Sequence, residues 1–553
     1  MIQSIDAILF DMGGTLRDSV PNDPPTRQRY IRKIVERLSL EDRDWEALFV
    51  ARERAYFKWA RQTLIELDEP GLWTQWMLPD QPAEKIAPLA VELNLLWRSA
   101  TATRPVFPET KEVVLELFRR GYRLGLVSNT TSSVEIPKLL REMDLRGCFE
   151  TVVLSCEVGM RKPGADILLE AVRQMEVEPG RCAYIGDRFE RDLAAARLAG
   201  FAGAVIMPHP RREGRPPEGQ QPDHIIHNLR ELLDLFPPRS EPEPKTRYPA
   251  SLSTMWRQHN FPGLADFFRA ARRMGFAGVE LNHQIDSSML QGLELEELPI
   301  SSLHEPCPAD VSVEELKQRG WVISSPDEEQ RRRGVEAIRR TVEMAARLRL
   351  PVVVVHCGLV SPDMTDESQL RRLLEAGGKD SVAFQDIQEK MRAARAARIG
   401  PCLEAVQLSL MELLEAAADT GVRLGLENRY HFFDIPSPDE MEMLLGLAGP
   451  ERLGFVYDAG HAQALDRLGF HPQEGWLRRF AHRMIETHLH DVIAVTDHLA
   501  PGRGEVDFDR LASWLPAGAL RTLELHPANT PGEVLAALKT LAGHGCFRGA
   551  DRG

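Results

Sequence analysis

Two sets of acidic, basic and imidazole side chains in this 553-residue sequence follow short apolar runs, one set in each half of the chain. Carboxylate oxygens suit Mg²⁺, a hydroxyl and an ammonium suit a phosphate, and a free carboxylate can attack phosphorus. Each residue alone could be an ordinary turn residue, but the ordered set favours a site. The first-half candidates are Asp11 in ILFDMGGTL, Ser128 and Asn129 in LGLVSN, Lys162 in GMRKPG, and Asp187 and Asp192 in YIGDRFERD.

The second set lies in the C-terminal half and mixes carboxylates with imidazoles. Such ligands suit Mn²⁺, Mg²⁺, Co²⁺ or Zn²⁺ and give no strong preference among them. A divalent cation here would chelate adjacent carbonyl and hydroxyl oxygens of a ketose or polyol and acidify the C–H between them. Glu427 and Glu524 could then remove and return that proton through an enediolate, while Arg429 and Arg503 are candidates for an anionic substrate group. The candidates are Glu280, His304, His356, Glu427, Asp458, His461, His488, His490, Glu524 and His526.

Strand-like runs in the first half carry the first set. The runs IDAILFD, YRLGLVSN, ETVVLS, CAYIGD and GAVIM alternate with helical stretches, which predicts a parallel sheet covered on both faces. In such a doubly wound sheet the carboxyl ends of the strands meet at a ligand crevice. Residues from about 17 to 105 instead show helical periods, so we expect a helical cap that excludes water and selects the substrate.

Eight strand-like segments in the second half predict a (β/α)8 TIM barrel, with the second set around one cavity at its C-terminal face. The longest excursion, from Ser361 to about Cys402, follows the fourth segment. A proline-rich, charged stretch over 237–248 predicts a linker between domains at 1–236 and 249–545. The eight segments are 249–255, 277–282, 300–304, 352–356, 422–427, 453–458, 485–490 and 521–526.

Composition narrows the class of protein. The net charge of −14 disfavours a nucleic-acid partner. Seven cysteines without a CxxC pair favour a reducing cytoplasm. The sequence has neither an apolar run of about 18 residues nor a signal-peptide pattern at its start. We therefore expect a cytoplasmic protein without a membrane or nucleic-acid partner, and a homo-oligomer remains open.

Residues 1–236 resemble the haloacid dehalogenase superfamily, in the branch with a helical cap between the first and second motifs. The resemblance implies Asp11 as the nucleophile of an aspartyl intermediate and Ser128 and Lys162 as holders of the transferred group. It also implies Mg²⁺ bound by Asp11, the Gly13 carbonyl and Asp187, with support from Asp192.

The sequence departs from this family at Gly13, where its phosphatases usually carry the aspartate that protonates the leaving group. Loss of a positioned acid typically costs about 10²–10⁴-fold in rate. This predicts a slow phosphatase, a substrate with a good leaving group, or a domain that binds without turnover.

Residues from about 248 to 540 resemble the xylose isomerase-like TIM-barrel superfamily, through GVEL, SSLH, VVHCG, LGLENR, FVYDAGHA, ETHLHD, DHLAPGRGEVDF and LELHP. Endonuclease IV belongs to the same superfamily, but Thr496 stands where its Asp-x-His pair has the aspartate, and Asp497 is displaced by one. That displacement and the acidic charge argue against DNA repair. The resemblance implies Glu427, Asp458, His488 and Glu524 as ligands of a single metal, His356 and His461 near the substrate, and His304 and His498 as candidate contacts.

Together the two halves predict a bifunctional enzyme of carbohydrate metabolism. Its barrel would be a metal-dependent sugar or sugar-phosphate isomerase or epimerase, and its N-terminal domain a phosphohydrolase. Three alternatives stay open: a barrel regulated by a catalytically impaired phosphosugar-binding domain, an endonuclease IV-like phosphodiesterase, and a scaffold with two degenerate sites.

Overall fold

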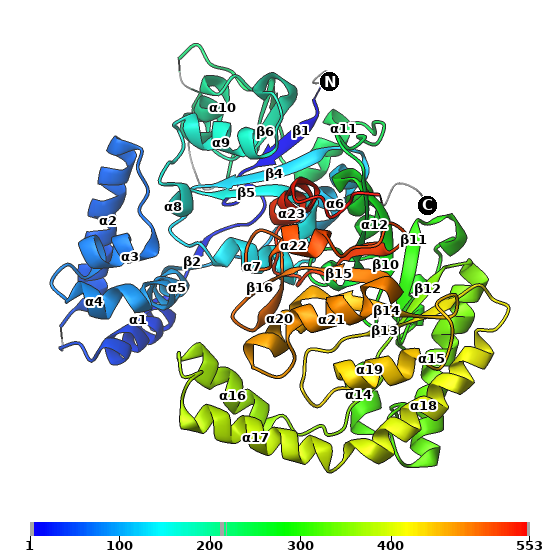
Figure 1. Ribbon diagram of the computed structural model, residues 1–553. Helices are drawn as coiled ribbons and strands as arrows, with labels where there is room; N and C mark the ends of the chain where they lie inside the picture. The colour runs from blue at the N-terminus through cyan, green and yellow to red at the C-terminus, as the bar shows by residue number, and fades with distance from the viewer. Residues whose placement is uncertain (1–4, 42, 211–214, 217, 550–553) are drawn as a thin grey trace. The chain divides into compact units, whose positions relative to one another are not determined.

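The computed structural model describes residues 5–41, 43–210, 215–216 and 218–549 (Figure 1). Backbone contacts divide the chain into two compact units. The first is Met1–Pro242 with His259–Pro262, and the second is Glu243–Gln258 with Gly263–Gly553. The division after Pro242 falls inside the stretch predicted as a linker, and the exact domain bounds stay predictions.

Six described strands of the first unit form one parallel sheet in the order β5-β4-β1-β6-β7-β8. The order runs outward in both directions from β1, so right-handed crossovers place helices on both faces, as predicted for a doubly wound sheet. The strands are β1 (Ala7–Phe10), β4 (Arg123–Ser128), β5 (Phe149–Leu154), β6 (Cys182–Gly186), β7 (Gly203–Ile206) and β8 (His224–Ile225).

A helical cap interrupts the chain between β1 and β4. A short antiparallel pair, β2 (Val20–Pro21) and β3 (Ala102–Thr103), closes its base. The cap has its own apolar core, in which Phe49 makes edge-on contacts with Trp73 and Trp97. Its helices are α1 (Pro24–Leu38), α2 (Trp45–Thr63), α3 (Glu69–Leu72), α4 (Ala83–Ile86) and α5 (Ala90–Thr101).

The remaining helices of the first unit lie between the sheet strands or, in the case of α11, after the last of them. Leu168 and Val172 of α9 and Ala196 of α10 join the apolar cluster that covers one face of the sheet. Between β6 and α10 lies a π-helical turn, η5 (Phe189–Leu193). The helices are α6 (Thr110–Arg119), α7 (Glu135–Glu142), α8 (Ser155–Val158), α9 (Asp166–Gln174), α10 (Ala194–Leu198) and α11 (Leu232–Leu235).

In the second unit, eight described strands close into a parallel barrel in the order β10-β11-β12-β13-β14-β15-β18-β9. Each of the eight predicted segments overlaps one of them, so the predicted barrel is confirmed. Val352, Val354, Val456 and Ile485 form an apolar cluster of strand residues. The strands are β9 (Tyr248–Ser253), β10 (Phe276–Leu281), β11 (Ile300–His304), β12 (Val352–Val355), β13 (Arg423–Glu427), β14 (Leu453–Asp458), β15 (Met484–Leu489) and β18 (Leu520–Leu523).

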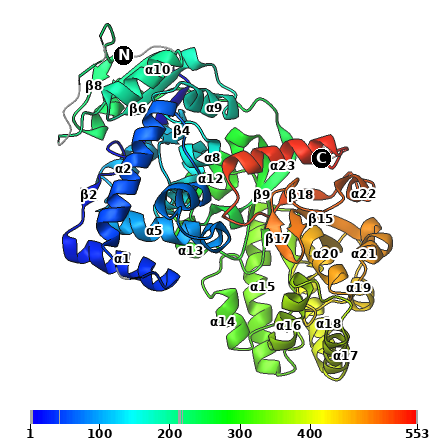
Figure 2. The same ribbon diagram turned by 90° about the vertical axis from the view of Figure 1, so that its left-hand side faces the viewer.

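Helices and one hairpin fill the connections of the barrel. The excursion after β12 forms α16 and α17, which lie side by side in Figures 1 and 2. The hairpin of β16 (Asp491–Ile493) and β17 (Thr496–Leu499) follows β15. Among the residues described, no helix is both long and apolar enough to cross a membrane. The helices are α12 (Leu264–Met274), α13 (Ser287–Leu290), α14 (Val313–Gln318), α15 (Glu328–Leu348), α16 (Thr365–Glu375), α17 (Val382–Ala396), α18 (Ile399–Ala416), α19 (Pro438–Leu445), α20 (Ala459–Arg467), α21 (Gln473–Phe480), α22 (Phe508–Ala512) and α23 (Pro531–Gly543).

Candidate functional site

The first candidate site lies at the carboxyl edge of the sheet. Asp11 follows β1, Ser128 ends β4 and Asp187 follows β6, so adjacent strands bring these residues together. Ligand oxygens of Asp11, Asp187 and Asp192 all lie within 4.8 Å of one another, and all three side chains are buried. The structure thus gathers the predicted carboxylates at one point.

Lys162 joins this cluster from the loop before α9. Its buried Nζ lies 2.7 Å from Asp11 Oδ1 and 2.8 Å from Asp192 Oδ1. Asn129, the candidate that follows Ser128, contacts the backbone of Lys162, and its binding of substrate stays a prediction. Its Nδ2 donates a 2.9 Å hydrogen bond to the Lys162 carbonyl, and its Oδ1 accepts one of 2.9 Å from the Lys162 N–H. Asn129 therefore holds the lysine-bearing loop.

Arg191, which the sequence reasoning missed, lies among the three carboxylates. One guanidinium nitrogen, NH2, is 2.6 Å from Asp11 Oδ2, 2.8 Å from Asp187 Oδ1 and 2.8 Å from Asp192 Oδ2. The oxygen donors alone suit Mg²⁺, but its oxygen ligands must lie at about 2.0–2.1 Å, which leaves no room for this nitrogen. As arranged, the cluster does not fit a divalent cation, contrary to the predicted Mg²⁺ site.

The surroundings of the cluster shift the pKa values of Asp187 and Asp192 in opposite directions. Burial raises the pKa of Asp187 to about 7, and the charges of Asp11 and Asp192 add to that effect against Arg191. Burial also opposes ionisation of Asp192, yet Arg191 and Lys162 together hold its pKa well below the usual value. The cluster thus contains both a strongly ionised carboxylate and one that titrates near neutral pH.

The two glycines after the nucleophile differ in what surrounds them. Gly14 has a φ of +90°, and a Cβ there would lie 2.1 Å from Asp187 Oδ2. A Cβ on Gly13 would meet no atom of the described residues within 4 Å. The position of the missing general acid is therefore open space, whereas Gly14 is required for the approach of Asp187.

A second group of charges lies where the loop after β1 meets the loop after β4. Arg17, whose backbone pairs with that of Gly13, places NH1 3.1 Å from Glu135 Oε1. Arg98 and Arg104 of the cap approach the same carboxylate at 2.5 and 3.8 Å. Although burial favours the neutral acid, the arginines lower the pKa of Glu135 to about 2. This ion-pair network joins cap and sheet, and sequence reasoning did not find it.

The second candidate site lies at the carboxyl end of the barrel strands. Ligand atoms of the four predicted metal ligands, Glu427, Asp458, His488 and Glu524, all lie within 4.8 Å of one another, and all four are buried. His488 Nδ1 faces the other three, at 2.9 Å from Glu427 Oε1, 3.1 Å from Glu524 Oε2 and 3.7 Å from Asp458 Oδ2. The structure therefore brings the predicted set together.

This barrel cluster fits a divalent cation. Within the described part of the chain, Glu524 Oε1 and Glu280 Oε1 are buried oxygens without a hydrogen-bond partner. Such groups are costly unless a ligand or ion satisfies them. Although burial favours the neutral acids, nearby positive groups lower the pKa values of Glu427 and Glu524 well below the ordinary range. Both carboxylates are therefore ionised, and Glu524 Oε1 is the cluster oxygen that lacks a hydrogen-bond partner among the described residues.

Two buried carboxylates lie beneath the four-residue cluster. Glu280 Oε2 is 3.2 Å from His488 Nε2, so Glu280 contacts the nitrogen opposite the cluster. Glu486, which the sequence reasoning missed, accepts hydrogen bonds of 2.9 Å from Ser302 Oγ and 2.6 Å from Thr522 Oγ1. Burial, with a contribution from Glu280, raises the pKa of Glu486 to about 7.

Besides the four-residue cluster, three groups of described residues in the barrel have metal-ligand spacing. Two add imidazoles at the border of the cluster, His304 and His356 with Glu427, and His461 and His498 with Asp458. The third consists of Glu280, His304 and His488. His304 Nε2 and His356 Nε2 are 2.6 Å apart, and His356 Nε2 is 3.2 Å from Glu427 Oε2. The predicted contacts therefore border the cluster.

Asp497 corrects one argument made from sequence. Although displaced by one position, its Oδ1 lies 3.0 Å from His498 Nδ1 and its Oδ2 lies 3.8 Å from His461 Nε2. The carboxylate that the sequence seemed to lack therefore reaches this group. His490 stacks on His498 with ring centroids 4.3 Å apart, and its Nε2 lies 2.9 Å from Asp458 Oδ2.

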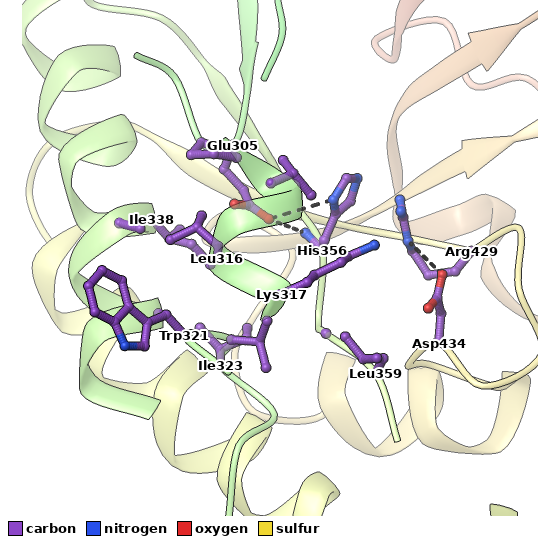
Figure 3. A pocket seen from close by; sticks show the side chains of 16 residues that line it. Glu305, Leu316, Lys317, Trp321, Ile323, Ile338, His356, Leu359, Arg429 and Asp434 are labelled. Atoms are coloured by element: carbon purple, nitrogen blue, oxygen red, sulfur yellow. Dashed lines mark hydrogen bonds and ion pairs between the residues drawn. The ribbon is translucent and has the colours of Figure 1, made fainter. Parts of the chain in front are cut away.

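A cavity opens beside the barrel cluster (Figure 3). Its polar lining consists of Glu305, Lys317, His356, Arg429 and Asp434. Arg429 forms ion pairs with Glu427 and Asp434. Arg503, the other predicted anion contact, instead pairs with Glu533 on the surface. The apolar wall consists of Leu316, Trp321, Ile323, Ile338 and Leu359.

Two enzyme-like sites, one at a parallel sheet edge and one at a barrel mouth, define a two-domain α/β protein. Residues 5–200 match the family model of haloacid dehalogenase-like (HAD-like) hydrolases, and residues 268–540 match that of the xylose isomerase-like TIM barrel. The chain therefore joins a HAD-like hydrolase domain to a xylose isomerase-like TIM barrel, as predicted.

Two curated phosphatases and one solved structure are similar to parts of the chain. A glyceraldehyde 3-phosphate phosphatase of Methanopyrus kandleri is 27% identical over 232 residues, which cover 42% of this chain and 97% of the relative. A phosphoglycolate phosphatase of Nitrosococcus oceani is 28% identical over 238 residues, 43% of this chain and 98% of the relative. The crystal structure of a D-tagatose 3-epimerase-like protein is 19% identical, covers 53% of this chain and 96% of its own, and has a TM-score of 0.37.

Proposed function

We propose that the barrel is a divalent-metal-dependent isomerase or epimerase of a sugar or sugar phosphate, and that the N-terminal domain is a phosphohydrolase of a related compound. The observation that carries the barrel proposal is the buried cluster of Glu427, Asp458, His488 and Glu524 beside an open cavity. The phosphohydrolase proposal is supported by the Asp11–Lys162 pair at the sheet edge and by the phosphatase relatives.

In the barrel, Glu427, Asp458, His488 and Glu524 would hold one divalent cation. When bound, that cation supplies Lewis acidity to adjacent carbonyl and hydroxyl oxygens of the substrate. Glu427 and Glu524 come from β13 and from the end of β18, three strands apart in the barrel. One carboxylate takes the proton from the acidified carbon, and the C–H electron pair moves toward the carbonyl oxygen. Return of a proton to the other face gives an epimer, and return to the neighbouring carbon gives an isomer.

The cavity supports a phosphorylated substrate. Lys317 and Arg429 supply positive charge at the end that borders the cluster, where a phosphate would gain charge-assisted hydrogen bonds. The opposite wall is apolar and suits the carbon chain of such a substrate (Figure 3). A polar, anionic end and a short carbon skeleton are features of a sugar phosphate.

In the N-terminal domain, Asp11 would attack phosphorus while the bond to the leaving oxygen breaks. Lys162, 2.7 Å from Asp11, balances the negative charge of the transferred group. With Gly13 in place of an acid, the leaving oxygen takes its proton from water. A second water then hydrolyses the aspartyl phosphate and restores Asp11.

Each half of the proposal has its own test. A panel of sugar phosphates is incubated in D₂O with Mn²⁺, and deuterium incorporation and phosphate release are measured. Glu524→Gln should abolish deuterium incorporation and leave phosphate release intact, and Asp11→Asn should do the reverse. Incorporation that survives both Glu427→Gln and Glu524→Gln would refute the barrel half. Phosphate release that survives Asp11→Asn would refute the other half.

A second candidate for the barrel is metal-dependent phosphodiester hydrolysis, which the two additional imidazole groups favour. Several adjacent cations can stabilise both the attacking and the leaving oxygen of such a reaction. Metal analysis separates the candidates: one equivalent per barrel supports the isomerase, and two or three equivalents with loss on His304→Ala or His498→Ala support the hydrolase.

A second candidate for the N-terminal domain is phosphosugar sensing without turnover. The absence of a carboxyl group at Gly13 and the engagement of both Asp11 oxygens by Lys162 and Arg191 favour it. Calorimetry with glyceraldehyde 3-phosphate distinguishes the two: binding heat without phosphate release supports sensing, and continuous release supports catalysis.

A further inference from the structure

The side chain of Arg191 occupies the centre of the carboxylate cluster in the N-terminal domain. Its NH2 nitrogen contacts Asp11, Asp187 and Asp192 at 2.6–2.8 Å, and its Nε lies 3.2 Å from Asp192 Oδ1. The side chain is only 17% exposed. One guanidinium nitrogen thus bridges residues that follow β1 and β6.

The remaining contacts fix the cluster around this arginine. Asp192 also bonds Lys162 Nζ at 2.8 Å and accepts hydrogen bonds from the N–H groups of Asp187 and Arg188 at 3.3 and 3.1 Å. Lys162 Nζ donates a hydrogen bond to Asp11 Oδ1, and Arg191 NH2 donates one to Asp11 Oδ2. Both oxygens of the proposed nucleophile are therefore bound by cationic side chains.

Arg191 and a divalent cation exclude each other from the carboxylate cluster, because both are positively charged and both need the same space. Lys162 and Arg191 face the three carboxylates, and Arg188 Nε also lies 3.9 Å from Asp187 Oδ2, so the cluster already approaches neutrality. A cation bound by the same three carboxylates would need oxygen distances of about 2.0–2.1 Å and would repel the guanidinium at close range. The two cannot share the space between Asp11, Asp187 and Asp192.

We propose that Arg191 is a built-in counter-cation that excludes divalent metal ions from the N-terminal domain, so that the Asp11 site binds phosphate compounds without Mg²⁺. Lys162 and Arg191 then supply the positive charge for a phosphate oxyanion, which a guanidinium recognises well. The proposal concerns the occupancy of the site and holds whether or not the domain turns over its ligand.

The test measures how many Mn²⁺ ions the full-length protein binds. The electron paramagnetic resonance signal gives the free Mn²⁺, and the bound Mn²⁺ is the total minus the free. Barrel sites contribute equally to all variants, so only differences are interpreted. Arg191→Gln should bind one equivalent more than the wild type, and adding Asp11→Asn to Arg191→Gln should remove that equivalent. Arg197→Ala is the matched control, because Arg197 lies on α10 and pairs with Asp223 at 2.9 Å, outside the cluster.

Two outcomes would overturn the proposal. One is an equal Mn²⁺ count for the wild type and a folded Arg191→Gln. The other is a count that falls by one when Asp11→Asn is made in the wild type, because the domain would then already hold a cation beside Arg191. The second measurement, on Asp11→Asn alone, does not require Arg191→Gln to fold. Neither arm measures phosphate release, so failure here is distinct from failure of the phosphohydrolase proposal.

Discussion

Glu280 Oε2 lies 3.2 Å from His488 Nε2, on the side of the imidazole opposite the four-residue barrel cluster. This contact fixes the ring so that Nδ1 points at Glu427 and Glu524. Carboxylates that orient a ligating histidine commonly contribute about 10–100-fold in metal affinity. Glu280→Gln should therefore weaken Mn²⁺ binding to the barrel by at least about 10-fold.

Competition with a chelating dye measures this affinity. Glu367→Gln is the control, because Glu367 is an equally buried barrel carboxylate that instead bonds Arg371 and His431. Equal Mn²⁺ dissociation constants for Glu280→Gln and the wild type would show that Glu280 does not position His488.

Removal of the metal should destabilise the barrel, because its cluster gathers three carboxylates around one imidazole. A ligand at 100 times its dissociation constant stabilises a folded state by about 2.7 kcal/mol. Scanning calorimetry should show an unfolding transition that rises with Mn²⁺ and falls with EDTA. Asp458→Asn should lose that dependence, and a wild-type transition that is indifferent to both additions would contradict the metal site.

The strand ends were predictable from sequence because their apolar runs and terminal polar residues are local features. Glu427 and Asp458 end buried strands and His488 lies one residue before the end of its strand, and a closed parallel barrel must bring such ends together. Glu486 could have been found by the same reasoning. It lies two residues before His488 and so points to the same side of β15, into the barrel.

The missed residues depend on contacts between distant segments. Arg191 stands next to Asp192, and nothing in ERD indicates that its side chain turns back toward Asp11, 180 residues earlier. Arg17 and Glu135 are 118 residues apart and meet only once cap and sheet have packed. Long flexible side chains adopt such positions through tertiary packing, which leaves no periodic signal in the sequence.

The arginines around Glu135 make stability depend on acid pH. Its pKa falls from 4.5 to about 2 in the folded protein, so the ionised group stabilises the fold above about pH 4.5. That contribution is lost as the pH falls through the range from 4.5 to about 2. At pH 7, Glu135→Gln should lower the free energy of unfolding by about 2–3 kcal/mol.

The difference between Glu135→Gln and the wild type should shrink below pH 4.5, as urea unfolding at several pH values will show. Glu92→Gln serves as control, since Glu92 pairs with Arg37 on the surface and both are about half exposed. It should change stability by less than about 1 kcal/mol at any pH. A constant deficit of Glu135→Gln down to pH 2 would exclude the electrostatic origin.

The two adjacent glycines of the nucleophile loop provide an internal comparison. Gly14→Ala forces a side chain into a positive-φ position and toward Asp187 Oδ2 at 2.1 Å, so we expect a loss of stability. Strain of this kind costs about 1–3 kcal/mol, before the displacement of Asp187 is counted. Gly13→Ala meets no described atom within 4 Å and should change stability by less than about 0.5 kcal/mol. Chemical denaturation, followed through the unfolding transition of the first unit, measures the change in stability of both variants. Equal changes would contradict the described loop geometry.

Lys317 should discriminate phosphorylated from unphosphorylated substrates of the barrel. Its side chain lines the cavity on the side of His356 and Arg429 (Figure 3), where an ammonium can bond a phosphate oxygen. A hydrogen bond to a charged group contributes about 1.5–3 kcal/mol. Because Lys317 is exposed, we expect the lower end of this range, which is about 10-fold in affinity for the phosphorylated substrate. Lys317→Gln should therefore raise KM about 10-fold for a sugar phosphate and leave KM for the free sugar unchanged. Lys379→Gln, at an exposed lysine between α16 and α17, is the control and should alter neither value. If Lys317→Gln raises both KM values equally, the lysine supports the cavity wall and does not read the phosphate.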